Sequence, residues 1–87
     1  MGKYNYCAYP EANETAFKKL CNALESVVAN ISKGDLLIDV DDSKLQFYAV
    51  NGAEIVVKNS YYIGAIYIES DVDLAPVADE LKRKLNG

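Results

Sequence analysis

The chain has 87 residues, 51% of them hydrophobic and 25% charged, and thirteen acidic against nine basic residues give it a net charge of −4. This length allows a single domain (residues 1–87) with one core, and the composition excludes a disordered chain. Binding to a phosphate backbone requires a concentrated basic footprint. The one basic cluster, residues 82–84, fits the end of a helix, so we expect no direct contact with nucleic acid.

The first expected element is a tyrosine-rich strand at residues 3–9, which ends at Pro10 because proline lacks a backbone N–H donor. Asn13 fits the N-cap of an amphipathic helix over residues 14–31. We expect Gly34 to close this helix in the left-handed conformation. The apolar residues that recur at helical spacing are Phe17, Leu20, Cys21, Leu24, Val27, Val28 and Ile31.

Four strands are expected next, over residues 35–41, 44–50, 53–58 and 61–69. Asp42-Ser43, Asn51-Gly52 and Asn59-Ser60 provide the turns between them, and Asn-Gly is the strongest short hairpin signal. Residues 61–69 are apolar on both faces. This pattern is typical of a central strand, or of a strand whose second face is covered by a partner.

A final helix is expected to begin at Asp71 or Asp73, with Pro76 in its first turn. The resulting order is β-α-β-β-β-β-α, and short turns between successive strands favour an antiparallel meander. The sequence therefore predicts an α+β two-layer sandwich in which both helices pack on one face of the sheet. The apolar stripe of the final helix consists of Leu74, Val77, Ala78, Leu81 and Leu85.

Residue types suited to catalysis are sparse. The chain contains no histidine, which removes the commonest general base and metal ligand. Ser43 stands beside Asp42 and Lys44, but these residues fit a turn rather than a catalytic site. The acidic stretches at residues 39–42 and 69–73 lack the loop of an EF-hand and fit solvated side chains and helix caps. We therefore expect no enzyme activity, no cofactor and no metal site.

The chain has no apolar run long enough to span a bilayer, and residues 1–5 lack the apolar segment of a signal peptide. We expect a cytoplasmic protein that makes no contact with a membrane. In that compartment Cys7 and Cys21 are expected to be buried thiols rather than a disulfide.

Surface recognition is the remaining class of function. If the helices cover Ile38, Phe47 and Ile55, the far face carries tyrosines bordered by carboxylates, a composition that suits binding to a protein partner. A shift of one residue in the last strand would instead turn Tyr62 outward. The predicted binding residues are Tyr48, Tyr61, Tyr67, Asp39, Asp41, Glu54 and Glu69.

We therefore predict a small, acidic, non-enzymatic protein-binding module. In size and charge it resembles small phage-encoded inhibitors, anti-CRISPR proteins among them. That resemblance implies an inhibitor that occupies the basic groove of a nucleic-acid-handling enzyme. The alternative is a homodimer or larger structural assembly formed through the apolar last strand, residues 61–69.

Overall fold

A computed structural model describes residues 3–86 of the chain, with the backbone alone for Asn86. Met1 and Gly2, part of the stretch considered above for a signal peptide, lie outside the described residues. The elements are β1 (Tyr4–Tyr9), α1 (Glu14–Val27), β2 (Ile31–Ile38), β3 (Lys44–Val50), β4 (Ala53–Ser60), β5 (Ala65–Ser70), the 3₁₀ turn η1 (Ala75–Val77) and α2 (Ala78–Asn86).

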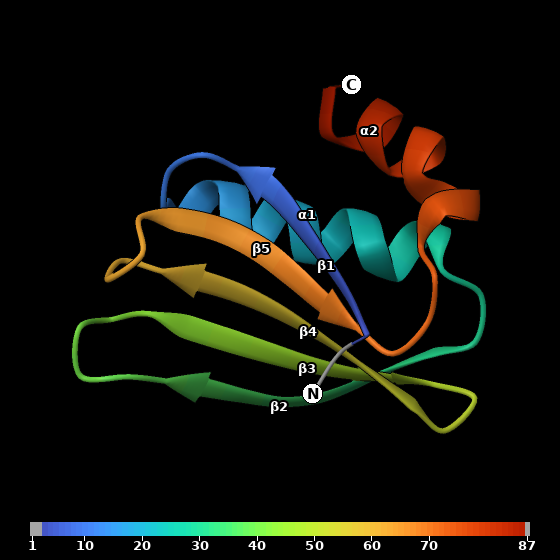
Figure 1. Cartoon of the computed structure of the whole chain (residues 1–87), viewed down its shortest axis with the longest axis horizontal. Coiled ribbons are helices and arrows are strands. Elements are labelled where there is room, and N and C mark those ends of the chain that lie inside the picture. Colours follow the sequence, from blue (N-terminus) through green and yellow to red (C-terminus); the bar gives the residue numbers. More distant parts are fainter. Residues whose placement is uncertain (1–2, 87) are drawn as a thin grey trace.

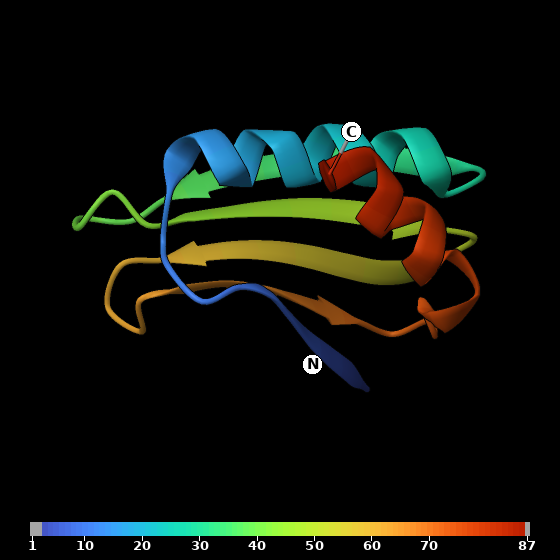
Figure 2. The same ribbon diagram turned by 90° about the horizontal axis from the view of Figure 1, so that it is seen from above.

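The five strands form one antiparallel sheet in the order β1-β5-β4-β3-β2, and the two helices lie on the same side of it (Figure 1 and Figure 2). The predicted α+β order β-α-β-β-β-β-α is confirmed. Strand β5 lies between β1 and β4, which agrees with its apolar pattern on both faces. Strands β1 and β2 form the two edges of the sheet.

Helix α1 begins at the predicted cap. The side chain of Asn13 accepts a hydrogen bond of 2.9 Å from the backbone N–H of Ala16, one of the donors that a helix start leaves unpaired. The backbone N–H of Asn13 donates in turn to the buried Asn59 side chain of β4, over 3.1 Å. The cap therefore also ties the start of the helix to the sheet.

The end of α1 differs from the prediction. The helix stops at Val27, Val28 is already extended, and Asn30 adopts a left-handed conformation with φ 61°. β-branched residues lose side-chain freedom in a helix, and asparagine tolerates positive φ better than most residues. The chain therefore turns at Asn30 and enters β2 at Ile31. The predicted continuation to Ile31 and closure by Gly34 are wrong.

Gly34 instead belongs to a β-bulge in β2. A Cβ atom at this position would lie 3.2 Å from the backbone oxygen of Phe47 on β3, so the close approach of the two strands favours glycine. The buried side-chain amide of Gln46 donates towards the bulge carbonyls of Gly34, at 3.0 Å, and Asp35, at 3.2 Å. The bulge is thus held by a specific polar contact from the neighbouring strand.

The turn between β4 and β5 lies later than predicted. Strand β4 continues through the buried Asn59 to Ser60, and the turn is formed by Tyr61 to Gly64. Gly64 supplies the positive φ of 78° that the turn requires, and its N–H donates to the carbonyl of Ser60 over 2.8 Å. Tyr61 therefore lies in a loop and not in a strand.

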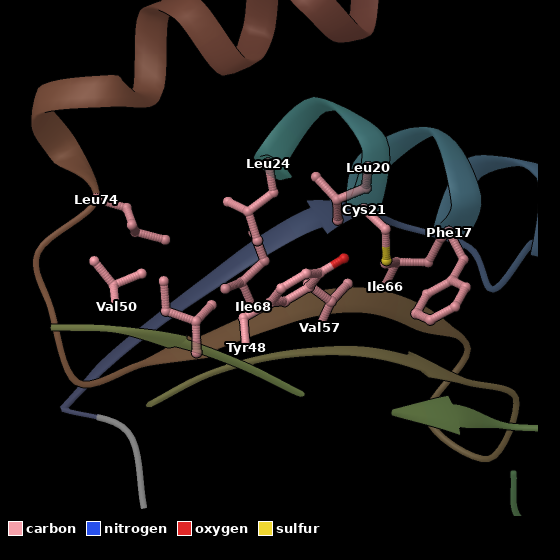
Figure 3. Packing of buried hydrophobic residues seen from close by; sticks show 11 residues of the cluster. Phe17, Leu20, Cys21, Leu24, Tyr48, Val50, Val57, Ile66, Ile68 and Leu74 are labelled. Atoms are coloured by element: carbon pink, nitrogen blue, oxygen red, sulfur yellow. The ribbon is translucent and has the colours of Figure 1, made fainter. Parts of the chain in front are cut away.

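The core lies between α1 and the inner face of the sheet, the face that the helices cover. Figure 3 shows side chains of α1 pointing down onto residues of β3, β4 and β5, with the ring of Tyr48 among them. The buried cluster consists of Phe17, Leu20, Cys21, Leu24, Tyr48, Val50, Ile55, Val57, Ile66, Ile68 and Leu74.

Helix α2 packs beside α1 on this side of the sheet, and a pocket of about 260 Å³ lies between it and residues of β1 and β5. Asp73 accepts a hydrogen bond of 2.9 Å from the N–H of Ala75, but the N-cap position of η1 is the residue between them, so the predicted cap is one residue too early. Pro76 lies in the first turn, as predicted. Leu81 and Leu85 pack against the core cluster. In the part of the chain that the structure describes, neither helix is both long and apolar enough to span a membrane.

Candidate functional site

The sheet has a second face, which neither helix covers; we call it the open face. Alternation along the strands and the pairing Phe47↔Val56 and Lys58↔Tyr67 place one set of side chains on it. Val56 is buried, and most of the others are half-buried or exposed. The set comprises Ser32, Leu37, Leu45, Phe47, Ala49, Glu54, Val56, Lys58, Ala65, Tyr67, Glu69 and Cys7.

A hollow of about 560 Å³ lies on this face beside the bulge of β2. Leu37, Phe47 and Ala49 give it an apolar lining, and Asp35 and Glu54 line it as well. Small residues and the bend of the bulge create this space. Its lining, apolar with two carboxylates and one lysine, suits an apolar or cationic group of a partner.

Tyr67 and Glu69 lie on the open face, as predicted, and both contact Lys58. The Lys58 ammonium lies 3.1 Å from the Glu69 carboxylate and 5.7 Å from the centre of the Tyr67 ring. This arrangement combines an ion pair with a cation–π contact, so the lysine charge is already compensated inside the face. Lys33 also lines the hollow, and its ammonium lies 3.6 Å from the carboxylate of Glu25, so two carboxylates and one compensated lysine border the hollow.

Tyr48 does not lie on the open face, and this prediction is wrong. Its side chain is only 2% exposed and lies in the core beneath α1. The hydroxyl donates a hydrogen bond of 2.6 Å to the carboxylate of Glu25 on α1. Burial, followed by the hydrogen bonds to Glu25 and Cys21, raises the pKa of Tyr48 far above that of a free tyrosine. Tyr48 therefore joins helix to sheet.

Phe47 takes the position that we expected for Tyr48. The signal that identifies this arrangement is the two-residue turn at Asn51-Gly52, because such a turn pairs the residues on either side of it. Counting back along both strands pairs Tyr48 with Ile55 and leaves Phe47 on the opposite face. The alternation of β3 points the other way, because the face of Phe47 is wholly apolar and the face of Tyr48 also carries a lysine and a glutamine.

The remaining predicted residues fall into two separate groups. Asp39, Asp41 and Tyr61 lie in the turns at one end of the sheet, where the hydroxyl of Ser43 accepts a hydrogen bond of 2.9 Å from the N–H of Tyr61. Glu54 lies towards the other end, where it lines the hollow. The sequence prediction therefore assigned these residues to one site, whereas the fold places them at opposite ends of the strands.

Asp41 has a local structural role. Its carboxylate accepts a hydrogen bond of 3.0 Å from the backbone N–H of Ser43, and this bond lowers the pKa of Asp41 below its usual value. Asp39 likewise accepts a hydrogen bond of 2.7 Å, from the N–H of Val40. Both carboxylates shape the turn between β2 and β3 while remaining exposed.

The two cysteines differ. Cys21 is buried in the core, and burial raises the pKa of its thiol. Cys7 is exposed on the open face, where it pairs with Tyr67 of β5. The expectation that both thiols are buried is therefore wrong for Cys7, because β1 is an edge strand that neither helix covers on this side.

Within residues 3–86, His, Cys, Asp and Glu side chains form no group of three or more that could hold a metal ion. Comparison of the chain with protein-family models, with curated proteins and with solved structures found no match. The functional argument therefore depends on the open face and on the edges of the sheet.

Proposed function

We propose that this protein is a small, non-enzymatic binding module that docks the open face of its sheet on a partner protein. The hollow beside Phe47 is the centre of the proposed contact. It accepts an apolar or cationic side chain of the partner, and Tyr67 extends the contact across the sheet.

The observation that carries this proposal is an uncovered apolar strip with a carboxylate border. Leu37 is 52% exposed, and it lies beside Phe47 and Ala49 around the hollow. Fully buried aromatic side chains supply much of the binding energy in protein interfaces, while charges at the rim select and steer the partner. Phe47 lies where such an aromatic anchor would lie. Asp35 and Glu54 lie at the rim of the hollow.

The charge of the chain indicates a basic partner. The net charge is −4, and Lys58, the cation on the open face within β2 to β5, is paired with Glu69. Enzymes that handle nucleic acid carry basic grooves for the phosphate backbone. An acidic protein that binds such a groove excludes the nucleic acid, so inhibition of an enzyme of this class is the function that we propose.

Substitution of Phe47 tests this proposal. The variant Phe47→Lys places a cation in the hollow, removes the aromatic anchor and repels a basic partner. Affinity capture from the native host, followed by quantitative mass spectrometry, should recover a basic protein with the unmodified chain. We expect its recovery with Phe47→Lys to fall by about tenfold or more, since loss of an interface anchor commonly costs at least 2 kcal/mol.

Ser26→Lys is the matched control, because it adds the same charge on an exposed position of α1, in the helix layer. Circular dichroism should show that both variants remain folded. A partner recovered equally well by the unmodified chain, Phe47→Lys and Ser26→Lys would contradict the proposal, because the open face would then contribute nothing to binding.

A further inference from the structure

Strand β2 presents an unpaired edge. It pairs with β3 on one side, and no strand within residues 3–86 pairs with its other side (Figure 1). The bulge at Gly34-Asp35 divides this edge into two parts. The second part, Leu36 to Ile38, runs into the turn towards β3 and continues the regular pairing with Lys44 to Gln46.

The direction of the backbone groups in this second part follows from the turn. The N–H of Asp39 donates to the carbonyl of Ser43 over 2.8 Å, which makes this the hydrogen-bonded pair that closes the hairpin. Hydrogen-bonded and non-hydrogen-bonded pairs alternate along an antiparallel ladder. The N–H and C=O groups of Leu37 therefore point to β3, and those of Leu36 and Ile38 point outward to the free edge.

The side chains along this edge are apolar and uncovered. Leu36 is 47% exposed and Ile38 is 60% exposed, on the inner side of the sheet, and Leu37 is exposed on the open face. Natural edge strands usually carry a charge, a proline or a bulge that discourages pairing with another strand. Strand β2 has Lys33 and the bulge in its first part, and nothing of this kind from Leu36 to Ile38.

Carboxylates surround this apolar segment. Asp35 precedes it, and Asp39, Asp41 and Asp42 follow it, all of them exposed. The two lysines of this hairpin are engaged with α1: Lys33 lies 3.6 Å from Glu25, and Lys44 pairs with Glu14. The charge available to an incoming strand at this edge is therefore negative.

We propose that the β2 edge from Leu36 to Ile38 receives an extended segment of the partner, with alternating apolar and basic residues, as a sixth strand. This inference rests on the proposed function and adds the mode of binding. Backbone hydrogen bonds to Leu36 and Ile38 provide affinity, as in other cases of strand addition. The apolar residues cover the exposed side chains, and the basic residues meet the four aspartates.

A second copy of this chain fits the edge less well. A two-fold axis through Leu37 would pair the apolar segment with itself and would place Asp35 of one copy opposite Asp39 of the other, twice. Like charges directly opposite each other destabilise a strand pair. A basic segment from another protein avoids this repulsion.

A peptide of ten residues with alternating valine and lysine serves as the probe. We expect it to slow amide hydrogen exchange at Leu36 and Ile38 by about tenfold or more at saturation, as measured by NMR on the full chain. A peptide with glutamate in place of lysine should leave both amides unchanged, because it would meet four aspartates. The lysine peptide with methylated backbone nitrogens should also fail to bind.

The variant Ile38→Pro removes one outward N–H while keeping the ladder to β3, since proline is tolerated where an edge N–H faces solvent. We expect about a tenfold loss of peptide affinity. Val40→Pro is the matched control, because position 40 is the first central residue of the turn from Asp39 to Asp42, where proline is favoured, and the N–H that it removes donates to the Asp39 carboxylate and not to the free edge. This control should retain full affinity.

Unchanged exchange at Leu36 and Ile38 in the presence of the lysine peptide would overturn the inference. Slow exchange at both amides without peptide, increasing with protein concentration, would also overturn it, because a second copy would then occupy the edge. Loss of partner capture with Phe47→Lys but not with Ile38→Pro would leave the proposed function intact and reject only strand addition. Loss of partner capture with Ile38→Pro but not with Phe47→Lys would reject the open face as the docking surface and retain strand addition at the β2 edge.

Discussion

The hydroxyl of Tyr48 and the carboxylate of Glu25 form a short hydrogen bond between the sheet and α1. We predict that Tyr48→Phe lowers the free energy of unfolding by about 1.5 kcal/mol at pH 7, because a hydrogen bond to a charged group is lost. This value is at the low end of the range for hydrogen bonds to charged groups, because the Glu25 carboxylate remains partly exposed and still has the Lys33 ammonium at 3.6 Å in the variant. Urea unfolding measures the change.

The same variant should alter the response to alkaline pH. Burial raises the pKa of Tyr48 in the folded protein, so its stabilising contribution is complete below the pKa of a free tyrosine, about 10. Above that pH the unfolded chain loses this proton while the folded protein keeps it. Stability then falls by up to about 1.4 kcal/mol per pH unit, and Tyr48→Phe should remove this part of the fall. Equal slopes above pH 10 for both proteins would contradict the assignment.

Tyr62→Phe is the control for both measurements. Tyr62 is 92% exposed in the turn between β4 and β5, so the loss of its hydroxyl should change the free energy of unfolding by less than about 0.5 kcal/mol. Seven tyrosines in one short chain thus have different roles: Tyr48 stabilises the core, Tyr67 lies on the open face, and Tyr62 is solvated in a turn.

At the level of elements, the bulge of β2 depends on one side chain. Gln46 is buried, and its amide donates towards the carbonyls of Gly34 and Asp35. We predict that Gln46→Leu, which has a similar volume, lowers the free energy of unfolding by about 1–3 kcal/mol, because two partly buried carbonyl groups lose their donor. Amide exchange should also become faster in β2 than in β5.

Asp35→Asn tests whether the loss of stability in Gln46→Leu comes from the bulge carbonyls or from the nearby negative charge of Asp35. It changes the exposed side chain beside the same carbonyl and should alter the free energy of unfolding by less than about 0.5 kcal/mol. A Gln46→Leu protein as stable as the unmodified one would show that the bulge does not depend on the amide. The bulge matters for function because it forms the hollow on one side of β2 and precedes the apolar edge on the other.

Local signals predicted several elements well. The N-cap of α1 at Asn13 and the hairpin at Asn51-Gly52 both depend on contacts within a few residues. The end of α1 was predicted less well, because the apolar spacing continues past Val27 to residues that the fold uses in a turn and in β2. Periodicity identifies a buried face, and it does not show which element a residue near a boundary belongs to.

For the molecule as a whole, the sheet order bears on how it assembles. The alternative function was a homodimer formed through the last strand, but β5 is hydrogen-bonded to β1 on one side and to β4 on the other. We predict that the chain is monomeric at micromolar concentration, because its free strand edge at β2 is bordered by aspartates and the net charge is −4.

Sedimentation equilibrium over a range of protein concentrations measures this directly. A mass of 9.6 kDa at every concentration is expected. A dimer that becomes tighter with Asp39→Lys would contradict the prediction and indicate pairing of two β2 edges, since the substitution introduces attraction with Asp35 of a second copy. A dimer that weakens when Tyr62 and Ile63 are replaced would indicate assembly through the exposed turn between β4 and β5.

The sequence by itself determined the α+β class, the order of the elements and their antiparallel connection, because helical periodicity, strand alternation and turn residues are properties of neighbouring positions. Only the tertiary structure decided which face of β3 the helices cover, and so whether Phe47 or Tyr48 is available to a partner. The physical reason is that alternation favours burial of the face with Phe47, because Lys44 and Gln46 share the other face with Tyr48; pairing with β4 and packing under α1 nevertheless bury the face of Tyr48.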